Sequence, residues 1–187
     1  VELLRHQKEW KLPFVIMEGL LGQVNDEVLR TAQREDQYAG MGTTMVVCTV
    51  ADDTAYIMNV GDSRLYYYNG RLKQITLDHS LVEELVRAGE LRTWESRNHP
   101  QKNIITRAIG VSESVTPDFF RVRMEEGSLL LLCSDGLSNM VDDEDLSDIL
   151  SLSLSEEDLA GKCIEEALFY GGADNIAVVI ARLEDGR

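Results

Sequence analysis

Three short acidic motifs lie far apart in the chain, each beside an apolar run typical of a β-strand: Gly61-Asp62-Ser63-Arg64, Ser134-Asp135-Gly136 and Gly172-Ala173-Asp174-Asn175. An aspartate beside a glycine at a strand end can turn its carboxylate toward a shared centre, and the glycine lets backbone or water approach closely. Mg²⁺ and Mn²⁺ prefer oxygen ligands, and sites that cleave phosphates often use two such ions, roughly 3.5–4 Å apart. The motifs therefore predict metal-assisted phosphate chemistry.

Each aspartate also has an explanation that needs no metal. Asp135 precedes a glycine, and Asp174 lies between a glycine-ended helix and a strand, so each fits a turn. Asp62 lies where two strands meet in a bend, which turn chemistry alone explains. The residues by themselves leave both interpretations open.

Other polar residues favour structural roles. Arg64 offers a charged fork to phosphate, but an arginine that enters a strand is more often an ion-pair partner. Histidine as a residue type suits acid–base catalysis, yet His79 stands where a helix is being capped, and we assign it a structural role. Asn175 is expected to serve its turn, and His6 and His99 to lie on the surface.

Length, charge and cysteine content narrow the class of protein. The chain has 187 residues, enough for one domain with a buried core, and a formal charge of −15, which argues against nucleic acid and anionic membranes as partners. No apolar run reaches the roughly 18 residues of a membrane span. Three cysteines in apolar runs lack Cys-x-x-Cys spacing, which favours buried thiols over a zinc site, and we expect a cytoplasmic location.

The elements that must position the motifs follow from hydrophobic periodicity. Phe14 to Arg34 is predicted as one amphipathic helix with Met17, Leu20 or Leu21, Val24 and Val28 on its buried face. Asn69-Gly70 predicts a tight hairpin turn. Strands are expected at 45–50, 55–60, 65–68, 72–75, 119–124, 128–133 and 176–183.

Helices are expected between these strands. Ser80 caps one that Gly89 closes, and the polar segment 90–102 is interpreted as a surface flap. Two more helices are predicted at 142–150, where the acidic run 142–145 suits a helix amino terminus, and at 156–170. Many short neighbouring strands with a few helices indicate an antiparallel α+β domain.

Five ordered motifs together resemble the bacterial type 2C, or PPM-type, metal-dependent serine/threonine protein phosphatases. They are Gly40-Met41-Gly42-Thr43-Thr44, Gly61-Asp62-Ser63-Arg64, Asp78-His79-Ser80, Leu132-Cys133-Ser134-Asp135-Gly136-Leu137 and Gly172-Ala173-Asp174-Asn175. The resemblance runs from about Gly40 to Leu183. It implies one domain over 1–187, built of two packed antiparallel sheets flanked by helices, with a helix and flap in 78–108.

The same resemblance implies a metal site and an activity. Asp135 would contact metal, Asp174 would hold a second metal, and Asp62 with Asp135 would hold a third, weaker ion, so that two to three Mg²⁺ or Mn²⁺ ions are expected. The implied reaction is hydrolysis of phosphoserine and phosphothreonine in proteins by a metal-activated water. Expected partners are phosphorylated proteins, including a cognate kinase, and neither nucleic acid nor membrane; a monomer is expected.

One part of the family pattern does not appear before Gly40. Family members open with an arginine that holds the substrate phosphate and an Asp-Gly-Met-Gly-Gly-His motif with a bridging aspartate and a proposed general acid. Neither precedes Gly40 here, so no residue is assigned these catalytic roles. We expect either that the chain begins inside a longer domain or that it is a shortened relative. The alternative function is a phosphatase-like module that binds a partner protein without hydrolysis.

Overall fold

The computed structural model describes residues 2–3, 12–97 and 99–184, and the chain divides into two compact units. Unit 1 comprises Val1–Asp62 and Leu77–Val122, and unit 2 comprises Ser63–Thr76 and Arg123–Arg187. The chain therefore passes from one unit to the other three times. The surface position expected for His6 lies outside the described residues.

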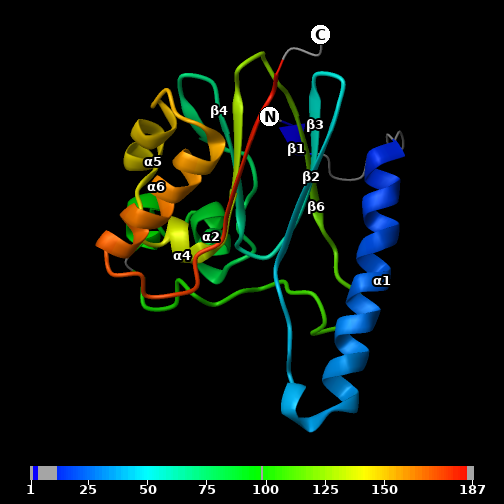
Figure 1. The fold of residues 1–187 in the computed structure, drawn as a ribbon. Helices are drawn as coiled ribbons and strands as arrows, with labels where there is room; N and C mark the ends of the chain where they lie inside the picture. The colour runs from blue at the N-terminus through cyan, green and yellow to red at the C-terminus, as the bar shows by residue number, and fades with distance from the viewer. Residues whose placement is uncertain (1, 4–11, 98, 185–187) are drawn as a thin grey trace. The chain divides into compact units, whose positions relative to one another are not determined.

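Unit 1 contains a four-stranded sheet in the order β1-β6-β3-β2 (Figure 1). The strands are β1 (Glu2–Leu3), β2 (Met45–Ala51), β3 (Thr54–Val60) and β6 (Asp118–Arg123). The predicted strands are thereby confirmed, while β1 had no signal because two residues are too few for a periodicity. Between β2 and β3, Asp52 has a φ of 54°, a left-handed conformation that aspartate tolerates better than most residues.

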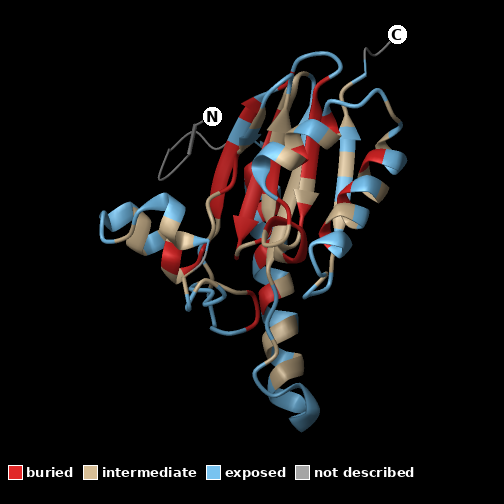
Figure 2. Cartoon of the chain, turned by 90° about the vertical axis from the view of Figure 1, so that its left-hand side faces the viewer, coloured by how far each residue is buried: buried red, intermediate tan, exposed pale blue. Residues whose placement is uncertain are grey.

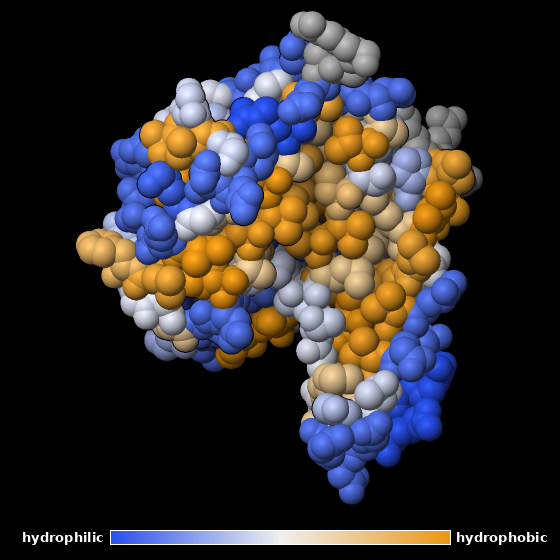
Figure 3. Space-filling model, in the orientation of Figure 1, coloured by the Kyte–Doolittle hydropathy of each residue, from blue (hydrophilic) through white to orange (hydrophobic). Residues whose placement is uncertain are grey.

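Helix α1 (Leu12–Arg34) confirms the long amphipathic helix and begins two residues earlier than predicted. Its apolar face packs on the sheet of unit 1, where Phe14 contacts the rings of Tyr56 and Phe119. Leu21 rather than Leu20 belongs to this face, since Leu21 is 2% exposed and Leu20 is 54% exposed. Figure 3 shows apolar side chains along the part of α1 that faces the viewer, and the exposed apolar residues of this helix are Leu12, Val15, Ile16 and Leu20.

The remaining elements of unit 1 are short: η1 (Asp36–Tyr38), α2 (Leu81–Ala88) and α3 (Thr93–Ser96). The predicted caps of α2 are confirmed, because the Ser80 hydroxyl accepts from the Glu83 amide and Gly89 is left-handed at a φ of 76°. The predicted flap is largely exposed but not wholly irregular, since α3 forms one helical turn in it. His99, expected on the surface, is half-buried.

Unit 2 contains the second four-stranded antiparallel sheet, in the order β5-β4-β7-β8. Its strands are β4 (Arg64–Tyr68), β5 (Leu72–Gln74), β7 (Leu129–Cys133) and β8 (Val178–Arg182). Three helices cover it: α4 (Asp135–Ser138), α5 (Asp143–Leu150) and α6 (Glu156–Phe169). In Figure 2 the buried residues concentrate on strands, and the helices show exposed outer faces.

One side of the unit 2 sheet packs against these helices. The core includes alternate residues of β7, Leu129 and Leu131, with Leu146 of α5 and Leu159 and Cys163 of α6. The alternation places one face of β7 under the helices, as a period of two requires. The predicted helices at 142–150 and 156–170 are therefore confirmed to within one residue at each end.

Two details of unit 2 differ from the sequence-based expectation. The hairpin turn spans three residues, 69–71, because Tyr68 pairs with Leu72, and within it only Gly70 is left-handed, with a φ of 69°. Helix α4 was not predicted, because four residues are too few to show a helical period.

Among the described residues, no helix is both long and apolar enough to cross a membrane.

Candidate metal centre

The register of unit 2 brings three strand ends together at one edge of its sheet. Cys133, the last residue of β7, pairs with Arg64 at the start of β4 and with Val178 at the start of β8. Residues that directly follow β7 and directly precede β8 therefore meet there. Asp135 is the second residue after β7, and Asp174 lies four residues before β8.

Hydrogen bonds hold these two loops against each other. The Ser134 amide donates to the Ala177 carbonyl at 3.0 Å, and the Ser134 hydroxyl both donates to the Asn175 carbonyl and accepts from the Ala177 amide, each at 3.0 Å. A Cβ added to Gly136 would lie 2.3 Å from the Asn175 carbonyl oxygen. The glycine of the Ser-Asp-Gly motif is thus needed for the close approach of the loops.

Asp135 carries the clearest electrostatic signal of the site. It is half-buried in the first turn of α4, and its carboxylate accepts from the side-chain amide of Asn139 at 3.2 Å. Burial raises its pKa, the negative charge of Asp174 raises it further, and these effects outweigh hydrogen bonds from nearby backbone amides and the positive charge of Arg64. Two carboxylates that repel each other at a strand end form a place where a cation lowers the free energy.

Asp174 is exposed, and its carboxylate acts both within its own loop and on Asp135. One carboxylate oxygen accepts from the backbone amide of the next residue, Asn175, at 2.7 Å, whereas the Asx-type turn expected here would use the amide two residues on. Its charge nevertheless reaches Asp135 and raises the pKa of that residue. The Asp174 carboxylate therefore makes a hydrogen bond within its own loop and also acts electrostatically on Asp135.

The chemistry of this pair suits a hard cation, since both side chains supply anionic oxygen. Within the described ranges 2–3, 12–97 and 99–184, no group of three or more His, Cys, Asp or Glu side chains gathers in a way that could hold a metal ion. The pair thus fits part of a ligand set. The assignment of Asp135 and Asp174 as metal ligands stays a prediction.

Asp62, the third predicted ligand, is the last residue of the first stretch of unit 1 and is half-buried. It follows Gly61, whose φ of 103° is accessible to few residues other than glycine. Its role in a third ion site with Asp135 also stays a prediction. Arg64, which follows in unit 2, donates to the Tyr66 hydroxyl at 2.9 Å.

A buried polar network in unit 1 was missed by sequence reasoning. The Gly61 amide donates to Nδ1 of His79 at 3.1 Å, and Nε2 of His79 lies 3.5 Å from Asp118, which forms an ion pair with Arg107 at 3.2 Å. Burial acts to raise the pKa of Asp118, but His79 and Arg107 outweigh it and lower that pKa to about 2. The Asp78-His79-Ser80 motif marked His79, but no local pattern identified its partners.

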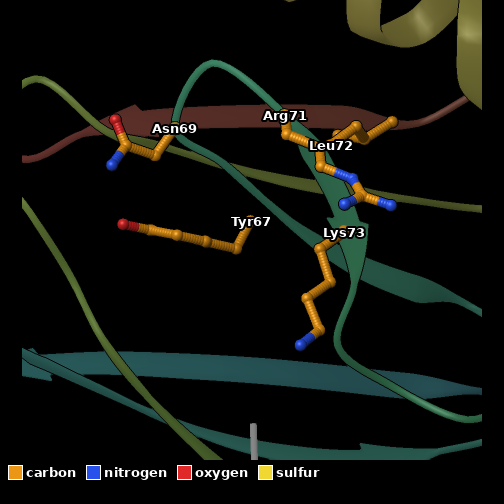
Figure 4. Close-up of a pocket in the computed structure, with 5 residues that line it drawn as sticks. All are labelled: Tyr67, Asn69, Arg71, Leu72 and Lys73. Atoms are coloured by element: carbon orange, nitrogen blue, oxygen red, sulfur yellow. The ribbon is translucent and has the colours of Figure 1, made fainter.

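The cysteine thiols and a separate pocket are not part of the Asp135–Asp174 site. Burial raises the pKa of Cys48 and of Cys163 to about 11, so both thiols stay neutral at pH 7. A pocket of about 410 Å³ lies on the β4–β5 hairpin (Figure 4). This hairpin is at the end of the unit 2 sheet opposite to Asp135. It is lined by Tyr67, Asn69, Arg71, Leu72 and Lys73.

Comparison with known proteins defines the family. The protein phosphatase 2C model matches residues 2–176, and the chain belongs to this family. The serine/threonine phosphatase stp of Listeria welshimeri is 45% identical over 159 residues, which cover 84% of this chain and 63% of the relative. The chain thus spans less than two thirds of that relative's length. The resemblance carried by the five motifs is confirmed.

Solved structures agree with the family match. Serine/threonine phosphatase Stp1 from Staphylococcus aureus has a TM-score of 0.89 and 35% identity, covering 97% of this chain and 72% of that chain. The catalytic domain of the phosphatase PstP, solved in complex with two manganese ions, has a TM-score of 0.83 and 31% identity, covering 96% of this chain and 74% of that chain. The predicted class, two antiparallel sheets flanked by helices, is confirmed.

Proposed function

We propose that this chain, acting as one phosphatase domain, hydrolyses phosphoserine and phosphothreonine in proteins with the help of Mg²⁺ or Mn²⁺. The observation that supports this most is the raised pKa of Asp135 beside Asp174, because a perturbed carboxylate pair at a strand end is typical of a site built for a cation. Family membership and the manganese ions of PstP support the same function.

In this proposal Asp135 and Asp174 hold the principal ions, and Asp62 with Asp135 holds a third. Such ions, when bound, supply a water of lowered pKa and neutralise charge on the phosphate. Asn139 orients the Asp135 carboxylate through its hydrogen bond, and Ser134 and Gly136 hold the loop of Asp174 against the end of β7 through their contacts with Asn175. The flap at 91–102 would shape access for the substrate.

The proposed partners are phosphorylated proteins, including a cognate serine/threonine kinase, and the proposed working state is a monomer in the cytoplasm. The charge of −15 supports the choice against nucleic acid and anionic membrane. The three cysteines are all free thiols, which supports a reducing compartment.

Mn²⁺ calorimetry beside a phosphopeptide hydrolysis assay tests the proposal. Asp135→Asn and Asp174→Asn should each lower Mn²⁺ affinity and turnover by at least about 100-fold, more than is usual for an outer-shell partner. Asp148→Asn, which removes an exposed charge from α5, is the matched control and should change neither. Metal binding with no hydrolysis would favour the alternative binding module, and absence of metal binding would contradict the metal site.

The third ion requires its own variant. Asp62→Ala should reduce turnover strongly while Mn²⁺ still binds at the principal sites, because Asp135 and Asp174 remain. Loss of all Mn²⁺ binding together with activity would place Asp62 among the principal ligands. Unchanged activity would mean that Asp62 only forms the turn.

A further inference from the structure

The Gly61–Asp62 turn in unit 1 is held in a narrowly defined geometry. At its φ of 103°, a Cβ added to Gly61 would lie 2.4 Å from the Thr44 side chain, so the turn is pressed against the residue that precedes β2. Both polar backbone groups of Gly61 are bonded, and its carbonyl also accepts from the buried Asn59 side chain at 3.2 Å. This carbonyl belongs to the peptide bond that leads directly into Asp62.

His79 holds Gly61 through both of its backbone polar groups. Its ring Nδ1 accepts from the Gly61 amide at 3.1 Å, and its backbone amide donates to the Gly61 carbonyl at 3.0 Å. The ring is 3% exposed, so water does not compete for these bonds. Its own carbonyl accepts from the Thr106 amide at 2.8 Å, which fixes the backbone of His79 in turn.

The partners of His79 determine which ring nitrogen carries the proton. Because Nδ1 accepts a hydrogen bond, Nε2 must be the protonated nitrogen of the neutral ring. Nε2 lies 3.5 Å from one oxygen of Asp118 and 3.2 Å from Nη1 of Arg107, which also lies 3.2 Å from the other oxygen of Asp118. Because the Arg107 guanidinium can only donate, the ionised Asp118 carboxylate is the group that can accept from Nε2 and so keep the Nδ1 lone pair directed at Gly61.

We propose that His79 is a positioning residue that sets the Gly61–Asp62 turn, with Asp118 fixing its tautomer and ring orientation. The consequence for catalysis rests on the proposed function, because it requires Asp62 to take part in the metal site. The role of the imidazole as a backbone clamp is independent of that function.

Two substitutions of His79 test the contacts of its two ring nitrogens separately. In His79→Asn the amide oxygen is as many bonds from Cβ as Nδ1, so the bond from Gly61 can persist. In His79→Gln the terminal amide reaches the position of Nε2, so the contact with Asp118 can persist while the Gly61 bond is lost. Both variants remove the ring, and loss of packing therefore affects them alike.

Amide hydrogen exchange of the 187-residue chain gives a readout that needs no activity. The Gly61 amide should exchange at least about tenfold faster in His79→Gln than in the wild type, the scale of one lost hydrogen bond, and should stay within about threefold of the wild type in His79→Asn. The Leu65 amide, which donates to the Thr76 hydroxyl at 3.0 Å in unit 2, is the control and should not change.

Turnover as a function of Mn²⁺ concentration completes the test. The Gln variant should need about tenfold more Mn²⁺ for half-maximal turnover, and the Asn variant should resemble the wild type. Equal Gly61 exchange in both variants would overturn the clamp. Faster Gly61 exchange with an unaltered Mn²⁺ dependence would overturn the catalytic consequence. A wild type without any hydrolysis contradicts the proposed function, yet a persisting exchange contrast would still support the clamp.

Discussion

Two aspartates, one in each unit, have pKa values displaced in opposite directions. Both are partly or fully buried, and burial acts to raise the pKa of each. In unit 1, His79 and Arg107 surround Asp118 and lower its pKa to about 2. In unit 2, the neighbour of Asp135 is another carboxylate, and its pKa is raised. The difference teaches that Asp118 is already balanced by the fold, whereas Asp135 leaves a charge imbalance that a cation can relieve.

Neutralising each aspartate tests this comparison most directly. Asp118→Asn should lower the free energy of unfolding by about 1.5–3 kcal/mol, the range for hydrogen bonds to charged groups, because it leaves Arg107 and His79 without their anion. Asp135→Asn should not destabilise the metal-free chain, because it removes repulsion from Asp174. Urea unfolding in EDTA measures both. A similar loss in the two variants would mean that Asp135 is a structural carboxylate.

A second test concerns the loop contact that keeps Asp135 beside Asp174. Gly136→Ala should destabilise the chain by about 1–3 kcal/mol, because its methyl group would collide with the Asn175 carbonyl and force the loops apart. Gly161→Ala is the control, since nothing lies within 4 Å of a Cβ there and alanine favours the α6 helix by roughly 0.5–1 kcal/mol. Thermal unfolding of both variants should give shifts of opposite sign.

The pH dependence of stability sharpens the comparison further. Since the folded pKa of Asp118 is about 2, its contribution to the free energy of unfolding is present above the ordinary aspartate pKa of 3.8 and is lost as the pH falls toward 2. Since the folded pKa of Asp135 is raised above 3.8, ionisation of Asp135 destabilises the metal-free chain as the pH rises above that value. The difference in unfolding free energy between the wild type and Asp118→Asn should therefore shrink in acid. The difference in unfolding free energy between the wild type and Asp135→Asn should grow toward neutral pH. Urea midpoints across the acidic range measure both trends.

The smallest effect is expected at the pocket on the β4–β5 hairpin. A strand rises roughly 3.3 Å per residue, so the five residues of β4 separate the hairpin from Asp135 by more than the Debye length of about 10 Å at 0.1 M salt. Arg71→Ala with Lys73→Ala should change hydrolysis of a small aryl phosphate less than about twofold. A tenfold loss would show that the basic hairpin acts on the carboxylate site.

Local patterns in the sequence predicted the parts of the fold that depend on local physics. The amphipathic period of α1, the apolar runs of β3 and β7, and the Ser80 and Gly89 caps are all local sequence signals. The approach of Asp135 to Asp174 was also predictable, because each follows or precedes a strand of one antiparallel sheet. The contact of His79 with Gly61 was not, since only tertiary packing brings these residues together.

The choice between Leu20 and Leu21 shows the same limit on a smaller scale. Both satisfy the helical period, and only the orientation of α1 on its sheet decides that Leu21 is buried. Likewise Asn69-Gly70 correctly predicted a hairpin, but the pairing of Tyr68 with Leu72 set a three-residue loop. Such details depend on register, which the sequence specifies only through the whole sheet.

The threefold passage of the chain between the units has a consequence for folding. Strand β4 pairs with β7 only after all of 77–122, which belongs to unit 1, has been synthesised, and β8 completes the sheet later still. Closing so long a loop costs conformational entropy before the β4–β7 contacts form and compensate for it, and this cost slows folding. On the ribosome, the β4–β5 hairpin must therefore wait with its β7-facing edge open until the carboxyl-terminal third of the chain emerges.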